Sequence, residues 1–551
     1  MLNSKTQKLI YAILFLIFAF QIARHVNDFY VPESDFFDYR QKAIELRNLQ
    51  WPENFKRPPL YSSLIAAISA PIVGKQRELY AAEIIGVLSV LFSFLLIFRI
   101  ARHFMGQNAF WVLWLWAMHP TTLRMAIKPK PEILVTVLIL WAFERFLNGD
   151  KKAYLVAFLA TLVRYEGAIA IMAFFVSDFV FSKEKIKTLL YAFLSGIFIV
   201  LWTFLHGQGK EGASYTNYFN TYQPNFAFLQ TFWVGLVGFL PVQLFKLWAL
   251  VGIALLTGGI IYSYKVFRRE CLAVVAFLAG FVAMHIIWPF SNIDYIVIIS
   301  WNAILLMALG VVGVLVLVKQ KLPQVRQKFA GWIEKRITVY FTAMLALITI
   351  LWTFRMKFPY PQYNVQWLIV LGFMVPVFLY LRRREWPIAL KLGFFVLCWL
   401  LAFYLNSKTN ADFFDIHYSK AEFRLTGEWF DRNRHAGERM VVAQPIVVAY
   451  YTSLDPDKDF IRLVDLPGEE PATLAKWISD HGATYVAWFS TNRVYEEGDA
   501  WYSWKRDNRG WRTIAFLQDG KSCDGFKLVQ TLRTGPRWAY IYKIDLPETD
   551  S

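Results

Sequence analysis

Residues 31–39 read Val31-Pro-Glu-Ser-Asp35-Phe-Phe-Asp38-Tyr39, in the first long polar loop after an apolar N-terminal run. Asp35 and Asp38 are three residues apart, and Tyr39 follows Asp35 by four. If a helix begins here, this spacing places all three side chains on nearly one face. Asp is also favoured at helix N-caps and in first turns, so capping is the alternative to a chemical role.

The chain around this loop is too apolar for one soluble domain. Of its 551 residues, 56% are hydrophobic and only 18% are charged. Many runs approach the roughly 20 residues that cross about 30 Å of hydrocarbon. We therefore predict a polytopic α-helical membrane protein with about thirteen spans, at residues 9–24, 78–98, 109–120, 131–147, 152–163, 166–181, 187–205, 243–266, 271–288, 295–318, 337–353, 366–381 and 387–405.

The net charge of +17 is not evenly distributed. Residues 1–405 carry 39 basic and 19 acidic side chains, whereas residues 406–551 carry 19 and 22. Much of the basic excess lies in short clusters between apolar runs, which is typical of the positive-inside rule. This predicts a cytoplasmic N-terminus and an extracytoplasmic C-terminus in the cytoplasmic membrane. Nucleic acid is excluded as a partner, because a basic patch for it should gather on a soluble domain.

The composition divides the chain into two domains. Residues 1–405 form the predicted membrane domain, whose first outer loop covers residues 25–77. Residues 406–551 alternate short β-branched runs with helix-like stretches, which predicts a small outer α/β domain with strands near 440–448, 484–489 and 539–544 and helices near 419–433 and 472–481. The C-terminal domain has no G-x-G-x-x-G and no Walker loop. Three cysteines are too few for a disulfide framework or a metal site.

The informative side chains are the charges at predicted membrane depth. Each costs roughly 2.5–3.5 kcal/mol on insertion scales, so such charges are usually paired or functional. On the predicted outer side they are Asp35, Asp38, Arg57, Arg124, Lys128, Lys130, Glu132, Arg164, Glu166 and Asp294. Acids and bases in one outward-facing cavity suit the binding of an anion together with the handling of a proton.

Each of these side chains also has a structural interpretation. Arg57, before two prolines, can snorkel to lipid headgroups. The Lys128-Pro-Lys130-Pro segment can be a rigid interfacial loop, and Arg164 can simply neutralise Glu166 at a helix break. His119 suits a packed interfacial position.

The order of several short motifs resembles a known family. Ser34-Asp35-x-x-x-Tyr39-x-x-x-Ala43 followed by Arg57-Pro-Pro-Leu-Tyr61 resembles the integral-membrane glycosyltransferases of the C-type (GT-C) fold. Among these, the chain is most similar to the protein O-mannosyltransferase and lipid A aminoarabinose transferase group, which is like glycosyltransferase family 39. The similarity continues at His119-Pro120, at Pro131-Glu132-Ile-Leu and at Thr161-Leu-Val-Arg164-Tyr-Glu166-Gly.

The resemblance implies transfer of a single sugar from a polyprenyl-phosphate sugar to a hydroxyl of an envelope acceptor, in one inverting displacement. The acceptor would be a glycan, a lipid or a protein, and membrane lipid surrounds the enzyme. Asp35 would be the catalytic base and Asp38 an auxiliary acid or a helix cap. The donor phosphate would be bound by Arg57, Lys128, Lys130 and Arg164. Further residues expected to line the site are Tyr39, Glu132, Glu166, Asp294 and Tyr295.

The chain departs from the family pattern at two places. Phe36 follows Asp35 where these transferases usually have Asp-Glu, and Asp294-Tyr295 stands where the fold often has Arg-Tyr. A divalent cation held by Asp35 and Asp38 remains open as a cofactor, with the donor phosphate completing its coordination. Two other functions also remain open: a transporter or flippase, and a glycan ligase or polymerase of a surface-polysaccharide system.

Overall fold

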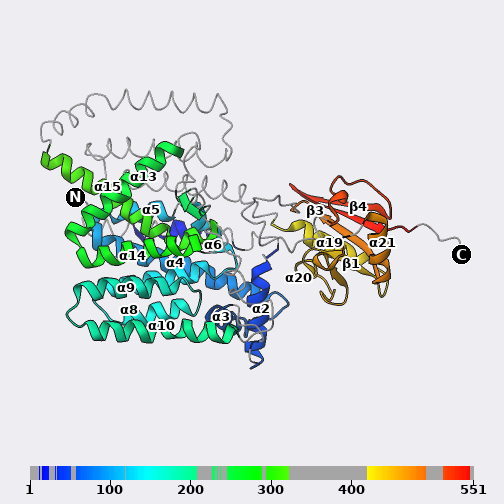
Figure 1. The fold of residues 1–551 in the computed structure, drawn as a ribbon, viewed down its shortest axis with the longest axis horizontal. Coiled ribbons are helices and arrows are strands. Elements are labelled where there is room, and N and C mark those ends of the chain that lie inside the picture. The colour runs from blue at the N-terminus through cyan, green and yellow to red at the C-terminus, as the bar shows by residue number, and fades with distance from the viewer. Residues whose placement is uncertain are drawn as a thin grey trace, which may run out of the picture. The chain divides into compact units, whose positions relative to one another are not determined.

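A computed structural model gives the fold of the chain (Figure 1). Apart from single positions it describes residues 34–50, 57–207, 245–287, 293–321, 419–491 and 513–546, with parts of 11–32 and 226–236. The chain forms two compact units. The first comprises Met1–Val26 and Lys42–Phe414, and the second comprises Asn27–Gln41 and Asp415–Ser551.

The first unit is a bundle of apolar helices. Within the described residues, four helices are long and apolar enough to cross a membrane, namely Arg77–Met105, Lys185–Trp202, Arg268–Ile287 and Ile296–Leu317. Side chains such as Phe193 and Leu250 are exposed on these helices and their neighbours, as expected of surfaces that face lipid. The protein is therefore a helical membrane protein.

Most described helices of this unit overlap predicted apolar runs, whereas Leu60–Ser69 and all but the first residue of Pro120–Ile127 lie outside the predicted spans. The described helices are α3 (Leu60–Ser69), α4 (Arg77–Met105), α5 (Ala109–Ala117), α6 (Pro120–Ile127), α7 (Glu132–Leu147), α8 (Lys152–Thr161), α9 (Gly167–Phe181), α10 (Lys185–Gly207), α13 (Phe245–Val266), α14 (Arg268–Ile287) and α15 (Ile296–Lys321). Three helices, α8, α9 and α10, pack side by side (Figure 1). The spans predicted at 337–353, 366–381 and 387–405, and most of the loop 206–242, lie outside the described residues.

The second unit is built on a five-stranded sheet of order β2-β1-β3-β5-β4. Its strands are β1 (Arg439–Val442), β2 (Phe460–Arg462), β3 (Ala483–Phe489), β4 (Phe526–Thr534) and β5 (Arg537–Ile544). β1 pairs in parallel with β2 and β3, while β5 pairs antiparallel with β3 and β4. The accompanying helices are α19 (Ala421–Asn433), α20 (Pro445–Val448) and α21 (Pro471–Asp480). This is the predicted α/β architecture.

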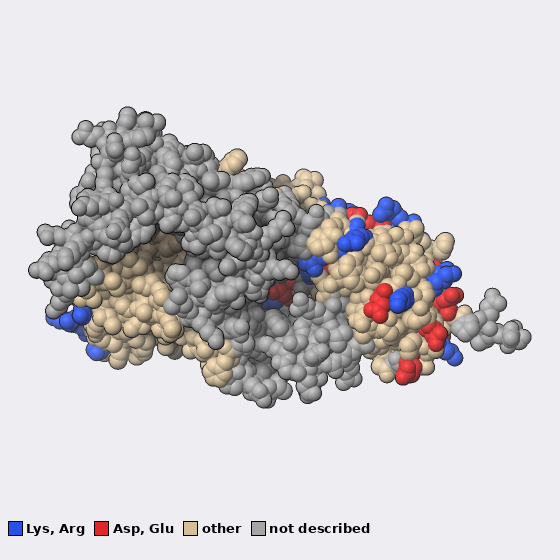
Figure 2. All heavy atoms as spheres, turned by 90° about the horizontal axis from the view of Figure 1, so that it is seen from above, with Lys and Arg blue, Asp and Glu red and all other residues tan. Residues whose placement is uncertain are grey.

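One predicted strand is too long. The run 440–448 was expected to be a single strand, but β1 ends at Val442 and Pro445 begins the helical turn α20. Proline has no N–H for a sheet ladder and suits the first turn of a helix, which explains the change of structure within one apolar run. On the face seen in Figure 2, acidic and basic side chains are interspersed over this unit.

The first outer loop contributes to both units. Helix α2 (Ser34–Arg47) begins in the second unit, and the boundary between the units falls inside it, between Gln41 and Lys42. Val31 and Phe37 are buried in the core of the second unit with residues of the sheet and of α19. The Val31 N–H also donates a hydrogen bond of 3.2 Å to the carbonyl oxygen of Ser419. Val31 and the part of α2 up to Gln41 therefore fold as part of the C-terminal unit.

Candidate functional site

One group of predicted site residues lies at the beginning of α2, in the second unit. A helix does start at Ser34, with Asp35 in its first turn and Asp38 one turn later. Both carboxylates are partly exposed, whereas Tyr39 is buried. The first turn of a helix favours a negative charge, so the capping interpretation and the catalytic interpretation of Asp35 are both compatible with this position.

An aromatic cluster of the second unit holds this part of α2. The ring of Tyr450 lies 5.2 Å from Phe37 in an edge-on arrangement and 6.5 Å from Phe36, and the guanidinium of Arg40 lies 5.5 Å from the same ring. Edge-on aromatic pairs and cation–π contacts each contribute roughly 0.5–1.5 kcal/mol. Tyr450, which follows α20, therefore anchors the turn that carries Asp35 and Asp38.

Replacing Tyr450 by Ala should loosen the start of α2 selectively. We expect a larger increase in amide hydrogen exchange in residues 34–41 than in β1 and β3, because the ring contacts of Tyr450 with Phe36, Phe37 and Arg40 lie on α2. Hydrogen–deuterium exchange with mass spectrometry on the full chain measures this. Phe516→Ala is the matched control, since the Phe516 ring packs edge-on against Phe526 of β4 at 5.3 Å, in another core cluster of this unit. Equal exchange in the two variants would contradict the anchoring role.

Another group of predicted site residues lies in the membrane unit and includes a lysine–aspartate cluster. The ammonium groups of Lys128 and Lys130 lie 2.7 Å and 2.9 Å from the same oxygen, Oδ2 of Asp294. All three side chains are buried. Two cations share one carboxylate, so this cluster carries a net charge of +1.

An arginine–glutamate cluster lies next to it in sequence and in space. Arg164 donates hydrogen bonds to Glu166 at 2.8 Å and to Glu132 at 2.9 Å, and its guanidinium lies 5.0 Å from the ring of Tyr295. Burial alone would lower the pKa of Arg164, but the charges of Glu166 and Glu132 outweigh it and raise this pKa well above its usual value. With each side chain in its usual charged form, Arg164, Glu132 and Glu166 sum to a net charge of −1.

Local sequence features place these side chains. Pro131 precedes the first residue of α7, so the Lys-Pro-Lys-Pro segment ends α6 and starts α7 within a few residues. In the turn between α8 and α9, a Cβ on Gly167 would clash with the backbone of Ala160 and Thr161, so only glycine permits this turn. The Leu60 N–H donates a 2.8 Å hydrogen bond to the Leu162 carbonyl, which ties the Arg57-Pro-Pro segment to the Arg164 turn.

The sequence interpretation did not include His285. Its ring, buried near the end of α14, lies 5.0 Å from the Tyr295 ring, beside the arginine–glutamate cluster. The sequence feature that indicates His285 as a candidate site residue is its position as a lone ionisable residue inside an apolar run. His119, in contrast, is buried at the start of α6 and accepts a hydrogen bond from the Thr121 N–H, which makes it a helix cap.

The structure thus gathers the predicted charges into two groups. The membrane unit brings together the six residues Lys128, Lys130, Glu132, Arg164, Glu166 and Asp294, with Tyr295 beside them. Asp35, Asp38 and Tyr39 belong to the second unit. The side chain of Arg124 lies outside the described residues. Among the described residues there is no group of three or more His, Cys, Asp or Glu side chains suited to a metal ion, so a cation at Asp35 and Asp38 would need ligands from a bound phosphate.

Comparison of the structure with solved structures identifies the architecture. The crystal structure of ArnT from Cupriavidus metallidurans bound to undecaprenyl phosphate matches with a TM-score of 0.52 and covers 98% of both chains at 12% identity. The chain has the GT-C fold. ArnT in the apo state gives a TM-score of 0.51 over 97% of both chains, also at 12% identity. No protein-family model matches the chain, and no curated protein matches it in sequence.

The match confirms the fold expected from the short motifs at residues 34–61 and 119–167. It extends over nearly the full length of both chains, so the GT-C fold here includes the C-terminal unit as well as the helical bundle. At 12% identity the similarity lies in the fold, and the roles of individual side chains rest on their own geometry.

Proposed function

We propose that the protein transfers a single sugar from a polyprenyl-phosphate sugar to a hydroxyl of a cell-envelope glycan, lipid or protein at the outer face of the cytoplasmic membrane. The observation that carries this proposal is the full-length GT-C fold shared with a structure that contains undecaprenyl phosphate. The buried charges in an apolar bundle agree with this proposal. A polyprenyl phosphate cannot leave the bilayer, so the enzyme has to bind its phosphate end at the membrane surface. The proposed topology has about thirteen spans, a cytoplasmic N-terminus and an outer C-terminal domain.

Asp35 is the proposed base. In one inverting displacement the acceptor oxygen bonds to the anomeric carbon, the bond from that carbon to the phosphate oxygen breaks, and polyprenyl phosphate leaves. The acceptor proton passes to the Asp35 carboxylate. A partly exposed carboxylate with ordinary basicity suffices, because the attacking hydroxyl becomes acidic as its bond to the sugar forms.

The two clusters differ in the cations that they contain. The ammonium groups of Lys128 and Lys130 can stabilise the negative charge that grows on the leaving phosphate. The arginine–glutamate cluster has a net negative charge, so we propose that Arg164 mainly organises the turn that it lies in. Arg57, whose guanidinium suits a bidentate contact with phosphate, is the proposed direct contact.

Arg57→Ala should weaken binding of the lipid donor specifically. A charge-assisted hydrogen bond contributes about 1.5–3 kcal/mol, so we expect the KM for the donor to rise about tenfold or more, and the KM for the acceptor to change much less. Steady-state kinetics with a short-chain polyprenyl-phosphate sugar measure both constants. Arg57→Lys keeps the charge but not the bidentate geometry. Its KM for the donor should therefore lie between those of the wild type and of Arg57→Ala. An equal rise in both constants would contradict a phosphate contact.

The choice of donor tests the proposed function itself. The purified protein should transfer sugar from a single-sugar polyprenyl phosphate in a vesicle that contains envelope acceptors. Transfer only from a lipid-linked oligosaccharide would show a glycan ligase instead. Movement of the lipid-linked sugar across the vesicle without a new glycosidic bond would show a flippase.

A further inference from the structure

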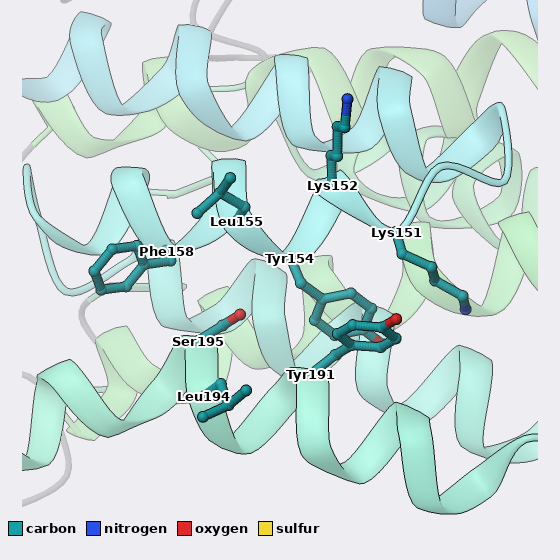
Figure 3. A pocket seen from close by; sticks show the side chains of 8 residues that line it. All are labelled: Lys151, Lys152, Tyr154, Leu155, Phe158, Tyr191, Leu194 and Ser195. Carbon is teal, nitrogen blue, oxygen red and sulfur yellow. The ribbon is translucent and has the colours of Figure 1, made fainter.

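A groove on the membrane unit lies apart from both charge clusters. It runs between α8 and α10 and has a volume of about 450 Å3 (Figure 3). Its walls are apolar, formed by Leu155 and Phe158 of α8 and by Leu194 of α10. Leu155 and Leu194 are each 57% exposed, so the groove is open to the surroundings of the helices.

One end of this groove is basic. Lys151 and Lys152 stand at the start of α8, the end opposite to the Arg164 turn. The Lys151 ammonium lies 2.7 Å from Asp178, and the same carboxylate also accepts a 2.9 Å hydrogen bond from Arg269. These three groups therefore carry a net charge of +1.

Lys152 adds a second positive charge. Its side chain is exposed, and none of the described carboxylates forms an ion pair with its ammonium group. Its backbone N–H donates a 2.9 Å hydrogen bond to Asp150, whose carboxylate pairs with Arg145 at 3.2 Å. The basic end thus has unbalanced positive charge.

Two tyrosines line the groove next to the lysines. The rings of Tyr154 and Tyr191 stack with centroids 5.9 Å apart, and the Tyr154 hydroxyl donates a 3.3 Å hydrogen bond to Asp178 (Figure 3). Tyr191 remains partly exposed. Tyrosines with one apolar and one polar side are typical of the headgroup level of a membrane. Along the groove, from the lysines inward, the lining residues are therefore first cationic, then aromatic and then aliphatic.

We propose that this groove is a binding site for an anionic glycerophospholipid. The lipid phosphate binds at Lys152 and Lys151, the glycerol region lies against the tyrosines, and one acyl chain follows Leu155, Phe158 and Leu194. The charge of the basic end favours an anionic headgroup and disfavours the choline of a zwitterionic lipid. This site is independent of the proposed sugar transfer, since it uses none of the groups assigned to it.

Native mass spectrometry of the full chain in detergent tests the proposal. Dioleoylphosphatidylglycerol and dioleoylphosphatidylcholine are titrated in parallel, and bound lipid is counted on the folded protein. We expect tighter binding of the phosphatidylglycerol. Lys152→Glu should weaken that binding about fivefold or more, because each basic residue near a membrane surface contributes about 1 kcal/mol to binding of anionic lipid. Lys185→Glu is the matched control, since Lys185 stands at the start of α10 against Phe179 and does not line the groove.

A second variant tests the apolar wall separately. Leu194→Trp fills the groove without changing charge and should reduce occupancy by phosphatidylglycerol. The thermal midpoint without added lipid should stay at the wild-type value in all three variants, which separates lost binding from lost folding. Equal binding of the two lipids would overturn the proposal. So would equal losses in Lys152→Glu and Lys185→Glu, or undiminished binding in Leu194→Trp.

Discussion

Asp35→Asn is expected to abolish sugar transfer while expression and membrane insertion remain at the wild-type level. The carboxamide has the shape of the carboxylate but cannot accept the acceptor's proton, and loss of a general base typically costs 10²–10⁴-fold in rate. Transfer of a labelled sugar from a polyprenyl-phosphate donor by the purified protein measures the effect.

The substitution also separates the two interpretations of Asp35. Asp35 lies in the first turn of α2, where losing a negative charge costs only about 0.3–1 kcal/mol, so a residue that only stabilises this turn would tolerate the change. The matched control is Asp38→Asn, one helical turn further along the same helix. We expect it to retain at least about a tenth of the activity, since an auxiliary acid adds less than the base itself. Activity in Asp35→Asn equal to that of the wild type would disprove the assignment of the base.

Arg164→Met should strongly destabilise the membrane unit. The substitution leaves Glu132 and Glu166, both buried, without their cation. Removing one partner of a buried ion pair typically costs about 3–5 kcal/mol, because the remaining charge is uncompensated. Thermal unfolding of the full chain in detergent, followed by tryptophan fluorescence, should show a clearly lowered midpoint or little folded protein.

Two further variants test whether the destabilisation comes from the uncompensated buried glutamates. Arg145→Met removes an exposed ion pair with Asp150 and should cost at most about 1 kcal/mol. A triple variant, Arg164→Met with Glu132→Gln and Glu166→Gln, removes the buried charges together and should recover much of the loss. Equal midpoints for Arg164→Met and Arg145→Met would contradict a stabilising role for the arginine–glutamate cluster.

Much of the membrane unit follows from sequence periodicity and charge. Helices such as α4 and α15 are long apolar runs, and their limits are set by charged or proline-containing segments. The six charges of the two clusters were found because a charge is costly beside apolar helices. Their pairing was not predictable: the sequence shows that Lys128 and Asp294 are polar, but only the fold brings residues 166 positions apart to 2.7 Å.

The second unit shows where such reasoning fails. Strand β2 is only three residues long, and β4 is largely exposed, so neither has a strong apolar signal. Val31 and Phe37 look like ordinary loop residues, because nothing local shows that they complete a core formed by the C-terminal sheet. His285 was missed for a related reason, since it is a single polar position in an otherwise apolar helix.

The division of α2 between the units has a consequence for synthesis of the protein. Val31 and Phe37 leave the ribosome early, but the core that buries them is made only after all of residues 42–414. This core is complete only when Ile541 has been made, so at about 5–20 residues per second the segment waits for roughly 25–100 s. Throughout that time its apolar side chains have no partner in the core, and the proposed base is not held in place. Because Phe37 is two residues from Asp35, the turn that carries the proposed base is completed only when the C-terminal unit has folded.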